Sequence, residues 1–112
     1  MFTITFANPK GGSGKTTSAM LLAEQIRAAG ATVAILDCDP NQNIVQWDAQ
    51  RAEQGRASPF LVRPVPTEAQ FLDTVDGIRG KADYLIIDLE GTASNLVTYA
   101  ISQSDLVLIP FE

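Results

Sequence analysis

Hydrophobic residues fall into five short runs along the chain, separated by longer stretches of mixed polarity. The runs cover residues 2–7, 32–36, 60–62, 84–87 and 106–109. Several of them are continuous rather than alternating, which is typical of strands that are covered on both faces in a parallel sheet. We therefore expect five strands, most of them buried.

The stretches between the runs predict four helices, over residues 15–29, 44–54, from 67 to Gly80, and 94–102. Gly30 and Gly80 are placed to end the first and third helices. Thr67 and Gln70 have the spacing of a capping box at the start of the third. The residues expected to face inward are Ala19, Leu22, Ala23, Ile26, Phe71, Leu72, Val75, Ile78, Leu96, Val97, Ala100 and Ile101.

Alternating strands and helices predict an α/β fold, with a mostly parallel β-sheet flanked by helices on both faces. The length of 112 residues suits one domain, over residues 1–112. In such sheets ligands bind at the carboxyl ends of the strands. Polar residues follow the first, second and fourth runs, so we expect these strand ends to form one binding edge.

Composition limits the classes of function. The net charge of −5 argues against a broad nucleic-acid surface on this segment. No apolar run approaches the ~20 residues that span a membrane, and the start of the chain lacks a basic leader. Cys38 is the single cysteine and histidine is absent, which excludes an intramolecular disulfide and a zinc cluster and suits a reducing, cytoplasmic setting.

A glycine-rich sequence, Lys10-Gly11-Gly12-Ser13-Gly14-Lys15-Thr16, stands between the first strand and the first helix. Its glycines allow consecutive amides to surround an anion, and the helix start adds a positive dipole. Lys15 would contact the outer phosphates and Thr16 would bind Mg²⁺, as in P-loop nucleotide-binding proteins. The predicted nucleotide-binding residues are Lys10, Gly11, Gly12, Ser13, Gly14, Lys15, Thr16 and Thr17.

The loop departs from the general P-loop pattern, because Pro9 stands where glycine is usual and a second lysine, Lys10, follows it. In this it resembles the deviant Walker A motif of the ParA/MinD family of ATPases. The resemblance implies that Lys10 reaches the partner's ATP across a nucleotide-sandwich homodimer. There it would neutralise charge as the γ-phosphate leaves, as an arginine finger does elsewhere. Taken without the family, Lys10 could equally be a solvated loop residue.

The second run ends in Asp37-Cys38-Asp39-Pro40, which is similar to the D-x-D-P element of the same family. The resemblance implies separate roles, with Asp37 in the Mg²⁺ environment and Asp39 orienting the attacking water. Asp39 together with Pro40 and Asn41 also has the composition of a simple turn. Cys38 is expected to pack rather than to act as a nucleophile.

The fourth run ends in Asp88 and resembles a Walker B element, so Asp88 is expected to bind Mg²⁺ through water. The next residues differ from the proline-containing loops of many family members. Glu90 is interpreted as a solvated loop acid, and Gly91 could present an amide to the γ-phosphate. Trp47, after the aspartate segment, is interpreted as a packing residue first and a partner contact second.

The resemblance covers the whole chain, although family members continue for about as many residues again, so we expect an N-terminal portion of a ParA-like protein. It implies an ATP- and Mg²⁺-dependent ATPase in plasmid or chromosome partitioning, with a DNA-bound partner protein and with DNA contacts outside this segment. The alternatives are a MinD-like membrane-cycling ATPase and a catalytically idle nucleotide-binding switch or scaffold. The last apolar run would lie near a sheet edge, where it would favour association or poor solubility.

Overall fold

The computed structural model describes residues 1–8, 15–65, 67–90 and 95–109, with the side chains of 8, 15, 68, 90, 95 and 96 left out. Within these residues, five strands and four helices alternate, close to the predicted positions. They are β1 (Phe2–Asn8), α1 (Lys15–Ala28), β2 (Val33–Asp37), α2 (Asn43–Glu53), β3 (Leu61–Pro64), α3 (Glu68–Ile78), β4 (Tyr84–Glu90), α4 (Asn95–Ser102) and β5 (Leu106–Leu108).

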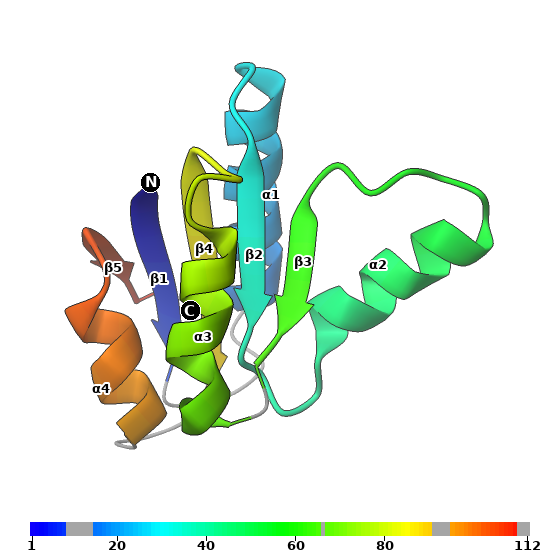
Figure 1. Ribbon diagram of the computed structural model, residues 1–112. Helices are drawn as coiled ribbons and strands as arrows, with labels where there is room; N and C mark the ends of the chain where they lie inside the picture. Colours follow the sequence, from blue (N-terminus) through cyan, green and yellow to red (C-terminus); the bar gives the residue numbers. More distant parts are fainter. Residues whose placement is uncertain (9–14, 66, 91–94, 110–112) are drawn as a thin grey trace.

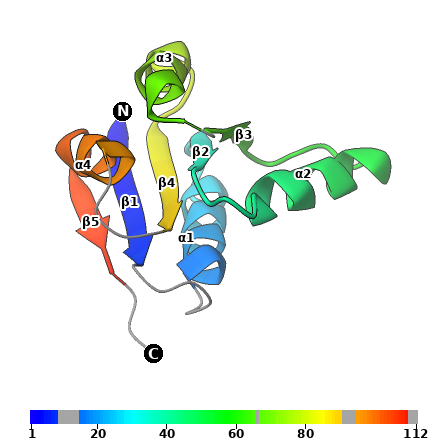
Figure 2. The same ribbon diagram turned by 90° about the horizontal axis from the view of Figure 1, so that it is seen from below.

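The five strands form one parallel sheet in the order β3-β2-β4-β1-β5. Figure 1 shows α3 and α4 in front of the sheet and α1 behind it, and Figure 2 shows the same two layers from below. Helices therefore cover both faces, and the predicted fold class is confirmed. All strands point the same way, so the carboxyl ends of β1, β2 and β4 meet at one edge.

Each face of the sheet has its own hydrophobic core. On the α1 side, Ile35 and Ile86 pack with Ala19 and Ala23, two alanines that let the helix lie close to the strands. On the other side, the strands pack against α3 and α4 through a cluster that includes Leu36, Leu85, Ile87, Phe71, Val75, Ile78 and Ala100. Fully burying one such aliphatic side chain contributes about 1.5–3 kcal/mol. Continuous apolar strands arise because both of their faces are inside.

β1 differs from the other central strands because two threonines alternate with its apolar residues. Thr3 and Thr5 are buried on the α4 side of the sheet. The amide of Thr3 donates to the Asp105 carboxylate at 2.8 Å, and the Asp105 amide donates back to the Thr3 carbonyl at 2.8 Å. The Thr5 hydroxyl bonds to the Ser104 hydroxyl. These bonds satisfy the buried polar groups and fix the turn from α4 into β5 against β1.

Two details of the helix predictions are wrong. Leu72 and Ile101 are 45% and 44% exposed, because α3 and α4 each turn a narrower face to the sheet than the spacing suggested. Thr67 is the N-cap of α3, but its side chain makes no capping hydrogen bond, so the capping box does not form. The backbone closes the turn instead, through the Gln70 amide and the Thr67 carbonyl at 3.3 Å.

The edges of the sheet are β3 and β5. At the β5 edge, Leu106 and Ile109 are exposed, as expected for an apolar strand beside a single neighbour. Among the residues that the structure describes, no helix has the length and apolar character to cross a membrane.

α2 buries little of its length. Of its eleven residues, all described, Ile44 alone is buried. In Figure 1 the helix projects from the side of the sheet, and the chain arches back from its far end to β3. Ile44 anchors the start of α2 in the core next to the carboxyl end of β2, and Val45 and Trp47 pack against the same core.

Candidate nucleotide-binding site

The strand ends bring the predicted carboxylates into one row. Asp37, the last residue of β2, pairs in register with Asp88 of β4, and Asp88 pairs on its other side with Phe6 of β1. Residues side by side in a sheet point to the same face. Ile35 and Ile86, two positions earlier, belong to the core on the α1 side, so both carboxylates face α1 and the start of α2.

Thr16 meets this row from α1. Its hydroxyl donates a hydrogen bond of 3.0 Å to a carboxylate oxygen of Asp88, 72 residues away in the chain. Asp88 is fully buried and Thr16 is partly buried, so the bond is shielded from water. The structure therefore joins two of the residues that the sequence assigned to Mg²⁺.

Asp37 has three backbone amides as partners. One oxygen accepts from the amides of Ile44 and Val45, each at 3.0 Å, and the other accepts from the Asp39 amide at 3.2 Å. The first two amides belong to the first turn of α2, whose N-cap residue, Gln42, has a left-handed backbone (φ 51°) and no side-chain capping bond. Asp37 thus supplies the cap of α2 from the neighbouring strand, as a carboxylate at the positive end of the helix.

Burial raises the pKa of Asp37 above its ordinary value, and the amides of Val45 and Asp39 oppose this shift without cancelling it. The nearby carboxylates of Asp88 and Asp39 add smaller upward contributions. The desolvated carboxylate is therefore held in place by amides while its charge is disfavoured.

Asp39 closes the turn that follows β2. Its carboxylate accepts from the Asn41 amide at 2.8 Å, and its carbonyl accepts from the Gln42 amide at 3.0 Å. The turn predicted from the residue types is confirmed. Positions 37 and 39 would share a face if β2 continued, but the strand ends at Asp37, so the two carboxylates make separate contacts.

Several predicted residues lie outside the described part of the chain. Lys15 begins α1, but its side chain is not described. Thr17 is described and exposed. It lies beside a small hollow of about 310 Å³, which is also lined by Thr16, Trp47 and Ile44. β4 continues to Glu90, so the prediction of a loop at that residue is wrong for its backbone. The loop residues outside the described ranges are Lys10, Gly11, Gly12, Ser13, Gly14 and Gly91.

The described site offers two oxygen ligands of the kind that Mg²⁺ prefers. Thr16 and Asp88 offer a hydroxyl and a carboxylate at the carboxyl edge of the sheet, and nucleotide-bound Mg²⁺ takes one or two protein ligands together with phosphate and water. Within the described ranges, no group of three or more acidic, cysteine or histidine residues could hold a metal by itself. The arrangement fits a shared site better than an all-protein cage.

The structure also shows where Cys38 and Trp47 lie. Cys38 is buried in the core on the α3 side, which confirms packing as its role. Trp47 is partly buried and packs against the α1-side core, with its ring centroid 6.0 Å from that of Phe60. The helix-capping role of Asp37 was missed. An aspartate six residues before the first residue of a helix carries no local signal of a cap.

Comparison with known proteins places this geometry in a family. A model of the VirC1 protein family matches residues 1–112, the whole chain. The chain belongs to the VirC1 family. The predicted resemblance to ParA-type partition proteins is confirmed with it, because the relatives include proteins named ParA, VirC1 and Soj.

Three relatives illustrate the range of similarity. Protein ParA of Rhizobium radiobacter is 38% identical over 108 residues, covering 96% of this chain and 47% of that protein. The VirC1 protein of Rhizobium rhizogenes is 31% identical over 109 residues, with the same coverage of 96% and 47%. The chromosome-partitioning ATPase Soj of Thermus thermophilus is 44% identical over 134 residues, covering 97% and 54%. The VirC1-family chain thus spans about half the length of these relatives.

Solved structures share the fold. A plasmid partition protein of Borrelia burgdorferi bound to AMPPNP superposes with a TM-score of 0.78 at 20% identity, covering 97% of this chain and 62% of that one. The pNOB8 ParA protein bound to nonspecific DNA gives 0.72 at 22% identity, covering 97% and 53%. The P-loop ATPase fold predicted from the sequence is therefore present in this VirC1-family chain.

Proposed function

We propose that this VirC1-family protein binds MgATP at the carboxyl edge of β1, β2 and β4 and hydrolyses it. The observation that carries the proposal is the hydrogen bond between Thr16 and Asp88 at 3.0 Å. It joins the residue after the P-loop lysine to Asp88 in the carboxyl-terminal half of the central strand, which is where a Walker A hydroxyl and a Walker B carboxylate must meet to share a metal ion.

The phosphates would be held by the loop before α1. The amides of Gly11, Gly12, Ser13 and Gly14 and the ammonium of Lys15 supply positive groups at the helix start. Thr16 and Asp88 would hold Mg²⁺, directly and through water respectively, and the ion would neutralise charge on the phosphates when bound. The contribution of Asp37 to this environment is indirect, because its carboxylate oxygens are already bonded to amides of α2 and of Asp39.

Asp39 is assigned to orienting the attacking water. It is buried next to the site and its turn is fixed by the Asn41 amide, so its carboxylate is held rather than free to rotate. Lys10 is assigned to the ATP of a second copy in a sandwich homodimer, as in the deviant Walker A family. The role of Lys10 would make hydrolysis depend on dimerisation.

The biological role follows from the relatives. They include a chromosome-partitioning ATPase, a plasmid partition protein bound to AMPPNP and a ParA protein bound to nonspecific DNA. We therefore assign the protein to ATP-dependent partitioning of a plasmid or chromosome, with a DNA-bound partner protein. The net charge of −5 argues against a broad DNA surface on this segment, so we assign direct DNA contacts to regions outside it.

The test compares nucleotide binding with turnover in the purified protein. Lys15→Ala should abolish binding of a fluorescent ATP analogue, whereas Asp39→Ala should bind it normally and release phosphate at least tenfold more slowly. The control is Lys81→Ala, because Lys81 is exposed in the turn after α3. It should change neither ATP binding nor phosphate release. Normal ATP binding by Lys15→Ala would remove the site assignment.

Hydrolysis and a nucleotide-dependent switch are separated by phosphate release with and without DNA. A partition ATPase should turn over slowly and be stimulated by DNA. If the protein binds ATP but releases no phosphate with or without DNA, it is a nucleotide-dependent switch or scaffold and not an ATPase.

A further inference from the structure

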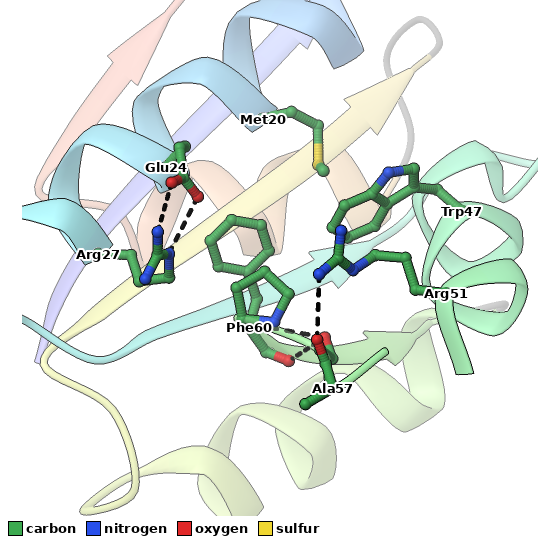
Figure 3. A pocket seen from close by; sticks show the side chains of 9 residues that line it. Met20, Glu24, Arg27, Trp47, Arg51, Ala57 and Phe60 are labelled. Carbon is green, nitrogen blue, oxygen red and sulfur yellow. Dashed lines mark hydrogen bonds and ion pairs between the residues drawn. The ribbon is translucent and has the colours of Figure 1, made fainter. Parts of the chain in front are cut away.

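A second hollow lies on the flank of the molecule, away from the strand ends. It occupies about 590 Å³ between α1, the outer part of α2 and the segment before β3. Figure 3 shows Met20, Trp47 and Phe60 on its walls, with Arg27 and Arg51 on opposite sides. We call it the flank pocket, lined by Met20, Glu24, Arg27, Trp47, Arg51, Ala57, Ser58, Pro59 and Phe60.

The flank pocket exists because the outer part of α2 projects from the body of the protein, so it is not a defect of the core. Its walls are held by specific contacts. The guanidinium of Arg51 lies over the Trp47 ring at 5.1 Å, and its Nη2 donates to the Ala57 carbonyl at 3.1 Å. The Ser58 hydroxyl donates to the Phe60 carbonyl at 2.7 Å. A pocket with fixed walls loses little entropy when a ligand enters.

The charges of the flank pocket are uneven. Arg27 is paired with Glu24, with Nε to Oε2 at 3.0 Å. Arg51 forms no ion pair with a carboxylate in the described part of the chain, and its Nε is buried without a hydrogen-bond partner there. A local excess of one positive charge thus lies beside two aromatic rings, on a chain whose net charge is −5. Because the guanidinium of Arg51 has no carboxylate partner among the described residues, a ligand that supplies one gains a charge-assisted hydrogen bond.

We propose that the flank pocket binds an extended segment of a partner protein in which a large apolar or aromatic side chain stands next to a carboxylate. The side chain would pack against Met20, Trp47 and Phe60, and the carboxylate would accept from the guanidinium of Arg51. Such a mixture of an aromatic anchor and a charge-assisted bond is common at the centre of protein interfaces.

A nucleic acid fits the flank pocket less well. It would bring a row of phosphates to a pocket whose wall carries the exposed carboxylate of Glu24 and which has one arginine without an ion pair in the described ranges. A peptide brings one or two charges and several apolar groups, which matches one unpaired arginine among aromatic walls. The pocket is also separate from the proposed ATP site, so its ligand does not depend on that assignment.

The single tryptophan of the chain, Trp47, makes binding visible. The probe is a blocked tetrapeptide of alternating aspartate and phenylalanine, titrated into the protein while Trp47 emission is recorded, and the control peptide has lysine in place of aspartate. We expect a saturable change with the acidic peptide and none with the basic one. No saturable change, or equal responses to the two peptides, would overturn the proposal.

Variants locate the site. Arg51→Gln should weaken the acidic peptide at least tenfold, whereas Arg79→Gln, an exposed arginine on the opposite side of the sheet, should leave binding unchanged. Glu24→Gln removes the competing carboxylate and frees Arg27, so it should tighten binding several-fold. This gain keeps the test decisive if Arg51→Gln disturbs the fold. Unchanged affinity in both Arg51→Gln and Glu24→Gln would refute the assignment.

Two further measurements exclude other occupants. Trp47 also lines the small hollow beside Thr16, so the titration is repeated with saturating MgATP, which should not compete with the peptide. Competition by MgATP would place the peptide at the nucleotide site and overturn the proposal. A change of emission with protein concentration alone, or an equal saturable response to a single-stranded oligonucleotide, would assign the flank pocket to a second copy or to nucleic acid instead.

Discussion

Replacing Asp37 by alanine tests whether one carboxylate anchors α2 to the sheet. The substitution leaves three amides without their acceptor, those of Asp39, Ile44 and Val45. Gln42, the N-cap residue of α2, has no side-chain capping bond that could compensate. We therefore expect Asp37→Ala to destabilise the protein by loosening the start of α2.

The magnitude comes from two opposing effects. Hydrogen bonds to a charged acceptor contribute roughly 1.5–3 kcal/mol each, but three of them cannot simply be added. Burial raises the pKa of Asp37 more than the amides lower it, so burying its charge costs free energy in the wild type. The Asp37→Ala variant avoids this cost, which offsets part of the stability lost with the three hydrogen bonds. Loss of a helix cap costs about 0.5–2 kcal/mol. Because the Ile44 amide is also buried, we expect a loss of about 2 kcal/mol at neutral pH.

Urea unfolding followed by Trp47 fluorescence and by circular dichroism measures this loss. With an m-value of about 1.5 kcal/mol/M, the midpoint should fall by roughly 1.3 M. Asp73→Ala, an exposed aspartate on α3, is the control and should move the midpoint little. Hydrogen exchange should quicken first at the amides of Ile44 and Val45. Equal midpoints and unchanged protection of these two amides would refute the capping role.

The pH dependence provides a second check on Asp37. Its pKa in the folded chain is raised by burial above the ordinary 3.8, so the folded state holds this proton more tightly than the unfolded state. The contribution of the protonated group is complete below that ordinary value and is lost as the pH rises through the raised pKa. The difference in stability between the wild type and Asp37→Ala should therefore shrink as the pH rises above about 3.8 and through the raised pKa.

Four further substitutions have distinct expected outcomes. Hydrogen bonds from the Thr32 amide and hydroxyl lower the pKa of exposed Asp83, so the destabilisation by Asp83→Ala should be present at neutral pH and fade in urea titrations as the pH falls below about 3.8. Phe71→Ala, at a fully buried position, should cost about 3–4 kcal/mol in thermal or urea unfolding, whereas exposed Leu72→Ala should cost little. Gly30→Ala meets no neighbouring atom but has φ +98°, so backbone strain alone should lower stability by about 1 kcal/mol, and no loss would contradict that cause.

The sequence alone determined the elements, their order and the fold class. Continuous apolar runs, helical spacing and glycines at helix ends are local signals, since each depends on residues within one or two turns of one another. The same is true of the loop motif from Lys10 to Thr16, whose spacing pointed to phosphate binding. The exposed positions of Leu72 and Ile101 were missed, because periodicity gives a helix an apolar side without saying how widely that side is covered.

Only the tertiary structure decided which distant residues meet. The bond between Thr16 and Asp88 depends on strand order and register across 72 residues. The capping of α2 by Asp37 depends on where β2 stops, and the flank pocket depends on the angle at which α2 leaves the sheet. Such contacts are set by packing between elements, because each residue's local preferences are the same whichever neighbour the fold finally brings to it.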